Sequence, residues 1–167
     1  MEDRPSASPC PRGSDSSREL KPESLANAGA RTVLLVEDNP TDVYVIREVL
    51  EKCGLNLRLR LAGDGEDALL YLQSLAKTKK SSCPALILLD LNLPKISGIE
   101  VLQQLRAGSP CRRTPVIVVT SSTAEGDRAA VQRLGAEAYF QKPKSLAAYM
   151  QLAGLIKRVL ASADNEI

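Results

Sequence analysis

Residues 86–94 read LILLDLNLP, a run of four large apolar residues followed directly by an aspartate, Asp90. A continuous apolar run of this length is typical of a strand that helices cover on both faces, as in parallel sheets. Residues 33–36 and 116–120 form two further runs of the same kind. The sequence therefore predicts a parallel β-sheet in which residues 86–89 form one strand.

Longer amphipathic segments separate the apolar runs, and this alternation is the pattern of βα units. The expected strands are Val33–Val36, Leu57–Ala62, Ala85–Leu89, Val116–Thr120 and Ala138–Phe140. Right-handed crossovers between them predict an α/β fold of the flavodoxin-like class, a doubly wound five-stranded parallel sheet in the order 2-1-3-4-5 with five helices. Leucine and arginine alternate in the second strand, which favours a half-exposed position at the edge of the sheet.

The five helices carry their own start and stop signals. The expected helices are Pro40–Lys52, Glu66–Leu75, a segment after the N-cap residue Ser97, a segment opened by the capping box Ser122-Thr123-Ala124-Glu125, and a segment from Ser145 to about Ala161. The last helix carries five large apolar residues, Leu152, Leu155, Ile156, Val159 and Leu160. They predict either ordinary core packing or a homodimer.

The chain has 167 residues and a mass of 18.0 kDa, which suits one domain. Residues 1–30 contain six serines and four of the ten prolines, too few large apolar side chains to offset the entropy of ordering, so we expect a disordered tail there. The domain is expected at residues 31–161, with a short tail at 162–167. We therefore expect no separate output domain.

Composition excludes several classes of protein. The chain has no histidine, and therefore no Ser-His-Asp triad and no histidine metal ligand. A net charge of +2 is too small for a dedicated nucleic-acid binder. The four cysteines form no CxxC pair, and we find no signal peptide and no apolar run long enough to cross a membrane. We expect a cytoplasmic protein with reduced structural thiols and no membrane contact.

Polar residues follow four of the strands, where ligands bind in doubly wound sheets. They are Glu37, Asp38, Asp90, Thr120 and Lys142. Three neighbouring carboxylates repel one another and need a cation, and an all-oxygen set suits a hard ion such as Mg²⁺. Carboxylate, Mg²⁺, lysine and hydroxyl together are what phosphoryl transfer requires, with Asp90 as acceptor and Thr120 as hydrogen-bond donor.

These segments resemble the receiver domain of two-component response regulators over about residues 31–161. The resemblance rests on VLLVEDNP at 33–40, LILLDLNLP at 86–94 with Gly98, Thr120-Ser121 and Lys142-Pro143. It implies that Asp90 is the phosphorylation site and that Asp38, Asp90 and the carbonyl of Asn92 bind Mg²⁺, with Glu37 acting through water. It also implies a cis bond before Pro143 and a switch in which Thr120 moves inward and Tyr139 rotates.

Residues 38–42, 64–68 and 90–95 are most similar to single-domain regulators that pair with phytochrome-type sensor kinases. The resemblance therefore implies a sensor histidine kinase as phosphodonor and an unidentified protein as downstream target, with signalling by protein–protein contact rather than enzymatic turnover. Two alternatives remain open from the residues. One is a Mg²⁺-dependent phosphohydrolase, which would lack its usual second aspartate because Asn92 stands there, and the other is an interaction module that needs no phosphorylation.

Overall fold

The computed structural model describes residues 29–78 and 82–166, so the predicted N-terminal tail lies almost entirely outside the described residues. Five parallel strands form one sheet in the order β2-β1-β3-β4-β5. Their bounds are β1 Arg31–Val36, β2 Leu57–Ala62, β3 Leu86–Leu89, β4 Val116–Thr120 and β5 Ala138–Gln141. The predicted fold class and strand order are confirmed, and each predicted strand is present within two residues of its expected ends.

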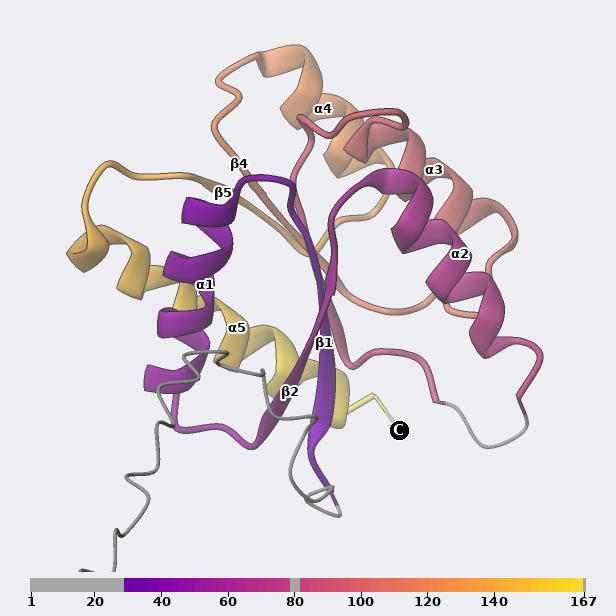
Figure 1. Ribbon diagram of the computed structural model, residues 1–167, viewed down its shortest axis with the longest axis horizontal. Coiled ribbons are helices and arrows are strands. Elements are labelled where there is room, and N and C mark those ends of the chain that lie inside the picture. The colour runs from indigo at the N-terminus through magenta and orange to yellow at the C-terminus, as the bar shows by residue number, and fades with distance from the viewer. Residues whose placement is uncertain (1–28, 79–81, 167) are drawn as a thin grey trace, which may run out of the picture.

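Five helices cover the two faces of the sheet (Figure 1). They are α1 Pro40–Lys52, α2 Gly65–Leu75, α3 Gly98–Gly108, α4 Glu125–Arg133 and α5 Leu146–Asp164. Helices α1 and α5 pack side by side on one face, while α2, α3 and α4 form a row on the other. All five strands consequently end at the same edge, where the site predicted from the sequence is expected.

Each central strand contributes side chains to two separate cores. In β1, Val33 and Leu35 pack beneath α1 and α5, whereas Leu34 and Val36 pack beneath the other three helices. Strands β3 and β4 alternate in the same way, and all four residues of β3 are at most 1% exposed. Burial on both faces explains why these strands are continuous apolar runs in the sequence.

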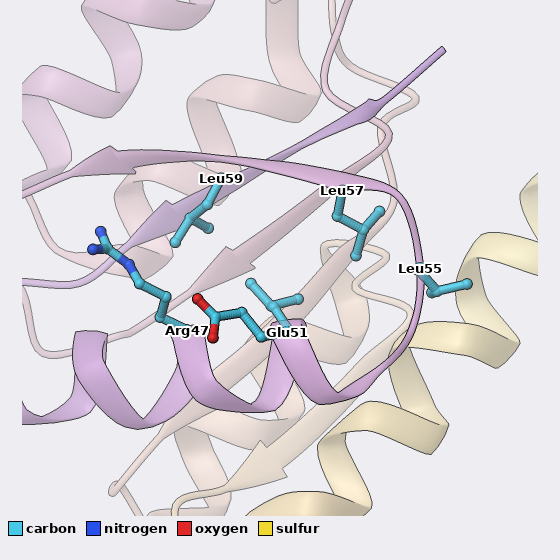
Figure 2. A pocket seen from close by; sticks show the side chains of 6 residues that line it. Arg47, Glu51, Leu55, Leu57 and Leu59 are labelled. Carbon is cyan, nitrogen blue, oxygen red and sulfur yellow. The ribbon is translucent and has the colours of Figure 1, made fainter. Parts of the chain in front are cut away.

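Strand β2 lies at the edge of the sheet, as its alternating sequence predicts. Arg58 and Arg60 are exposed, and charged side chains on an edge strand discourage pairing with another chain. The β2 leucines face α1 instead, across a surface cavity of about 350 Å³ (Figure 2). Its lining consists of Arg47, Leu50, Glu51, Leu55, Leu57 and Leu59. This cavity lies apart from the carboxyl ends of the central strands and does not form part of the predicted site.

The loop between β3 and α3 folds back tightly on the strand that precedes it. A Cβ atom on Gly98 would collide with the backbone carbonyl oxygen of Asp90 and with Leu91. The backbone N–H of Gly98 also donates to the carbonyl of Leu91 at 3.0 Å. Only glycine fits this contact, so Gly98 fixes how the chain leaves Asp90 and enters α3.

Two helix ends differ from the sequence prediction. The predicted capping box at residues 122–125 is absent, because Ala124 is the N-cap of α4 and makes no side-chain cap. Ser122 lies two residues earlier, where its hydroxyl donates to Asp127 at 2.6 Å and accepts the N–H of Ala124. Helix α5 continues three residues past Ala161, since no glycine or proline stops it, and Asp164 near its end pairs with Arg31 at 2.9 Å.

The apolar residues of α5 lie against the protein's own core. Leu152, Ile156 and Leu160 are buried, and Leu155 and Val159 pack against the same cluster. Ordinary core packing therefore accounts for all five residues, and the predicted homodimer stays a prediction without support from them. No helix among residues 29–78 and 82–166 has the length and apolar character to span a membrane.

The prediction of reduced structural thiols is wrong for two of the four cysteines. Cys83 and Cys111 form a disulfide, with Cα atoms 5.5 Å apart. Cys83 precedes β3 and Cys111 precedes β4, and the pairing of these strands brings the two loops together. Cys53 is a free thiol buried beneath α1 and α5, and Cys10 lies outside the described residues.

Candidate functional site

The polar residues that follow β1 and β3 are buried at the edge where the strands end. Glu37 is 2% exposed and Asp90 is 4% exposed, although each is a carboxylic acid. Thr120, the last residue of β4, is completely buried. Burying ionisable groups is costly in free energy unless they are paired. The burial of these acids therefore indicates a functional pocket rather than charged residues on a solvated surface.

Three carboxylates gather into one cluster. One oxygen each from Glu37, Asp38 and Asp90 lies within 4.8 Å of the others, and Asp38 is the exposed member of the set. An all-oxygen donor set with two buried carboxylates fits a hard divalent cation such as Mg²⁺. The sequence predicted these three residues, and the structure brings all three together.

Lys142 supplies the positive charge in this pocket. Its Nζ donates to Glu37 Oε2 at 2.7 Å, to Asp42 Oδ2 at 2.8 Å and to Asp90 Oδ2 at 2.9 Å. Burial opposes the charged form of Lys142, but the hydrogen bonds to these carboxylates outweigh it and raise its pKa above the usual value. Lys142 is therefore a fixed cation beside the oxygen atoms of Asp90.

In Glu37, unlike in Lys142, the effect of burial on the pKa outweighs the effect of the hydrogen bonds. Burial raises the pKa of Glu37 to about 7, and the hydrogen bonds from Lys142 and from the backbone N–H of Asn39 only partly offset this effect. In the absence of a metal ion, this carboxyl group is therefore partly protonated at neutral pH. A cation that binds the cluster must displace that proton.

Asp42 and Tyr149 are two residues of this site that the sequence reasoning missed. Asp42 lies in the first turn of α1 and bonds to Lys142, and the Tyr149 hydroxyl lies 3.5 Å from Asp42 Oδ1. Burial and the neighbouring Asp42 raise the pKa of Tyr149 to about 12, so its hydroxyl stays protonated. A signal for Asp42 was present, because the first turn of a helix that follows a strand lies at the same edge as the strand end.

Asp90 is also held by the backbone of its own loop. The N–H of Asn92 donates to Asp90 Oδ1 at 3.2 Å, while Lys142 holds Oδ2. Asn92 itself is exposed, and the resemblance implies a metal-ligand role for its carbonyl oxygen, which stays a prediction. With one partner for each oxygen, the Asp90 carboxylate has a fixed orientation.

Thr120 and Tyr139 connect the pocket to the surface formed by α4 and β5. The Thr120 hydroxyl accepts the N–H of Ser122 at 3.2 Å, and the Tyr139 hydroxyl donates to the carbonyl of Ser122 at 2.8 Å. The Arg128 guanidinium lies over the Tyr139 ring, 5.2 Å from its centroid. Ser122 thus joins the buried hydroxyl of β4 to the half-buried aromatic ring of β5.

The peptide bond between Lys142 and Pro143 is trans, which corrects the cis bond that the resemblance implied. Lys142 is positioned by other means, because its backbone N–H donates to the carbonyl of Thr120 at 2.8 Å and its Nζ contacts three carboxylates. The trans form is also the favoured state of an X-Pro bond. No cis peptide bond occurs among the described residues.

Comparison with known proteins places this pocket in a family. The family model for the response regulator receiver domain matches residues 33–153. The chain is 38% identical over 116 residues to "Response regulator Rcp1" of Synechocystis sp. (strain ATCC 27184 / PCC 6803 / Kazusa), an alignment that spans 70% of this chain and 79% of Rcp1. The matched residues include β2 to β5, all of β1 except its first two residues, and all of the pocket residues described above.

Two solved structures support the same placement. The phosphorylated cyanobacterial phytochrome response regulator RcpA superimposes with a TM-score of 0.71 at 33% identity, covering 80% of this chain and 95% of RcpA. The Mn²⁺-bound form of response regulator Rcp1 gives a TM-score of 0.68 at 35% identity, covering 76% of this chain and 91% of Rcp1. A divalent metal ion is thus part of a structure that this chain resembles closely, in agreement with its own carboxylate cluster.

Proposed function

The chain belongs to the response regulator receiver domain family, whose function is two-component signalling, and we propose that Asp90 is its phosphorylation site. The observation that carries this proposal is the environment of Asp90, a 4% exposed carboxylate that lies in the carboxylate cluster and 2.9 Å from Lys142. This chain has no histidine, so the donor is a phosphohistidine on a separate protein or a small acyl phosphate. Transfer forms a bond between phosphorus and an Asp90 oxygen and breaks the bond between phosphorus and the donor nitrogen or oxygen.

Each pocket residue has a distinct role in this proposal. Glu37, Asp38 and Asp90, with the carbonyl of Asn92, hold the Mg²⁺ ion, which supplies charge stabilisation for the transferred group when it is bound. Lys142 offers a second cation, already within hydrogen-bond distance of Asp90. Thr120 donates its hydroxyl hydrogen to the phosphoryl oxygen atoms, because that hydroxyl accepts rather than donates in its bond to Ser122.

The output of the domain is a change at the face formed by α4, β5 and α5. Phosphorylation draws Thr120 inward, and Tyr139 rotates toward the space that Thr120 leaves. The hydrogen bond from Tyr139 to Ser122, two residues beyond Thr120, supports this link between pocket and surface. A downstream protein would then bind one state of this face in preference to the other.

A phytochrome-type sensor histidine kinase is the proposed phosphodonor, and the proposed location is the cytoplasm. RcpA is a cyanobacterial phytochrome response regulator, and its structure matches 80% of this chain at 33% sequence identity. Of the three segments that carried the same expectation, 38–42 and 90–95 contribute Asp38, Asp42 and Asp90 to the pocket, and 64–68 contributes no residue to it. A phosphotransfer profile against purified kinases of several sensor classes tests the assignment, since rapid transfer from a kinase of another class would contradict it.

The test of Asp90 uses the full chain with acetyl phosphate and Mg²⁺. Intact-protein mass spectrometry is expected to show one phosphoryl group on the wild type and on Asp164→Asn, which removes an exposed acid that pairs with Arg31. The Asp90→Asn variant is expected to show none, with circular dichroism confirming that it folds. Equal labelling of Asp90→Asn would overturn the proposal. Sustained release of phosphate from generic phosphate esters would instead favour the phosphohydrolase.

A further inference from the structure

The disulfide between Cys83 and Cys111 lies near the amino ends of β3 and β4, whereas the pocket lies at the carboxyl ends of the strands. Cys83 precedes the first residue of β3 and Cys111 lies in the loop between α3 and β4, so the bond joins the segments that enter two neighbouring strands. The 28-residue separation encloses β3, Asp90 and all of α3 within one covalent ring. Nothing in the phosphorylation chemistry uses these sulfur atoms.

The two cysteines differ in how accessible they are. Cys111 is 2% exposed and belongs to the core beneath α2, α3 and α4, whereas Cys83 is half-buried and packs on the edge of that core. Cys83 is therefore the more accessible of the two residues to an external thiolate. The route of attack on a disulfide depends on such access.

Hydrogen bonds hold the loop of Cys111 in place without the sulfur atoms. The Arg106 guanidinium donates to the carbonyl oxygens of Arg112 at 2.7 Å and Thr114 at 2.9 Å, and also to those of Leu134 and Gly135. The Cys111 N–H donates to the Ser109 hydroxyl at 3.1 Å, and the Cys111 carbonyl accepts the N–H of Thr114 at 2.9 Å. None of these hydrogen bonds involves a sulfur atom, so we expect this loop to keep its shape when the disulfide is reduced.

The segment that carries Cys83 is anchored in a similar way. The N–H of Ala85, two residues later, donates to the carbonyl of Thr32 on β1 at 2.8 Å, and the N–H of Ile87 donates to the carbonyl of Pro115 at 3.0 Å. The backbones on both sides of the disulfide are thus fixed by the sheet. Reduction would leave two thiols close together in a folded protein, ready to form the bond again.

We propose that Cys83 and Cys111 form a reversible redox site that exchanges with low-molecular-weight thiols and disulfides of the glutathione class. In the reducing direction, a glutathione thiolate attacks Cys83 Sγ, the bond between the two protein sulfurs breaks, and Cys111 leaves as a thiolate that takes up a proton. A second glutathione then attacks the mixed disulfide, which releases the Cys83 thiol and oxidised glutathione. Two electrons and two protons pass to the protein, and oxidised glutathione reverses the reaction.

The consequence of the exchange is a change in the stability of the half of the domain that carries Asp90. Closing a ring of this size restricts the unfolded chain, so the oxidised protein resists unfolding more than the reduced protein does. Disulfides in reducing compartments are usually transient or redox-sensing rather than permanent. The reduced thiols predicted from the sequence and the disulfide in the structure would then be the two redox states of Cys83 and Cys111.

The experiment equilibrates the full native chain with mixtures of reduced and oxidised glutathione, quenches with acid, and labels free thiols with a maleimide under denaturing conditions. Mass spectrometry of the digested protein, which counts the label on Cys10 separately, is expected to show Cys83 and Cys111 gaining or losing their two labels together, in a single step. Cys83→Ser, which cannot form the bond, is expected to show no such paired step. Cys53, buried in the other core with a pKa raised by burial, serves as an internal thiol that remains free throughout.

Circular dichroism and thermal unfolding of both states complete the test. The reduced wild type is expected to keep the native far-ultraviolet spectrum and to unfold at a lower temperature than the oxidised form, while Cys83→Ser unfolds at one temperature in both buffers. Two results would overturn the proposal. One is that the pair stays reduced in excess oxidised glutathione. The other is that the bond opens only after the protein has unfolded, as the bond of a permanent structural disulfide would.

Discussion

Lys142 Nζ donates to Asp42 Oδ2 at 2.8 Å, and Asp42 lies outside the carboxylate cluster that Lys142 also contacts. The other two partners of Lys142, Glu37 and Asp90, both belong to that cluster. A metal ion bound there would compete with Lys142 for their oxygens. Asp42 would then be the carboxylate that still accepts a hydrogen bond from Lys142. Asp42 is therefore a positioning residue for the ammonium group of Lys142.

Replacing Asp42 with asparagine is expected to slow phosphorylation of Asp90 by acetyl phosphate. Asparagine keeps an oxygen that can accept from Lys142 but loses the negative charge, which costs about 1 kcal/mol in the orientation of Lys142, or roughly fivefold in rate. Mg²⁺ affinity is expected to change little, because Asp42 is not in the cluster. Labelling rates and calorimetric Mg²⁺ titrations measure the two effects separately.

The matched control is Glu51→Gln, which removes an exposed carboxylate from the far end of the same helix. It is expected to label at the wild-type rate. If Asp42→Asn also labels at that rate, Lys142 does not depend on Asp42 for its position. A parallel loss of Mg²⁺ affinity would instead indicate a general disturbance of the pocket.

Mg²⁺ binding is expected to weaken as the pH falls. Burial raises the pKa of Glu37 to about 7, so its carboxyl group is ionised at pH 8 and protonated at pH 6. Glu37 must lose this proton before its carboxylate can bind a cation. The coupling to one proton makes the Mg²⁺ affinity about tenfold lower at pH 6 than at pH 8. Titration calorimetry at the two pH values measures the ratio.

The variant that isolates this effect is Glu37→Gln, which cannot titrate. Its Mg²⁺ affinity is expected to be lower than that of the wild type at pH 8 and nearly the same at both pH values. A wild-type affinity that is equal at pH 6 and pH 8 would show that Glu37 is ionised throughout this range.

The strands of this fold were predictable because burial on both faces leaves a continuous apolar run, as in β3. The strand ends Glu37, Asp90 and Lys142 were predictable for a related reason, since a polar residue directly after such a run must lie at the edge of the sheet. Spacing along the chain determined these positions, and the structure confirms that Asp90 and Glu37 share one pocket with Lys142.

The features that the sequence did not reveal depend on how loops and helices approach one another. An aspartate in the first turn of a helix is commonplace, so the position of Asp42 after a strand end did not single it out as a partner of Lys142 before the approach of α1 was known. Cys83 and Cys111 are 28 residues apart, and only the paths of two loops bring them into contact. Local motifs also misplaced the cap of α4, because Ser122 bonds to Asp127 instead.

Removing the hydroxyl of Tyr139 is expected to destabilise the protein modestly without preventing phosphorylation. The group donates to the carbonyl of Ser122 at 2.8 Å, and loss of one such hydrogen bond costs about 1 kcal/mol. Urea unfolding of Tyr139→Phe measures the change in unfolding free energy. The control is Tyr44→Phe, because Tyr44 is 65% exposed, and this variant is expected to unfold like the wild type. Equal stability of both variants would show that the bond to Ser122 contributes nothing.

Two glycine-to-alanine substitutions are expected to change stability in opposite directions. The Cβ of Gly98→Ala would collide with the backbone of Asp90 and Leu91, and the loop must shift, which costs about 1–3 kcal/mol. Gly154 lies exposed within α5, and a Cβ there meets no atom within 4 Å. Alanine at that position is expected to stabilise the helix by about 0.5–1 kcal/mol.

Mg²⁺ titration separates the loop's role in the site from its role in folding. Gly98→Ala is expected to bind Mg²⁺ more weakly even under conditions where it is fully folded, because the displaced carbonyl belongs to Asp90, a member of the carboxylate cluster. Gly154→Ala is expected to bind Mg²⁺ as the wild type does. Urea midpoints and calorimetry give both quantities, and a folded Gly98→Ala with wild-type affinity would show that the tight loop serves stability alone.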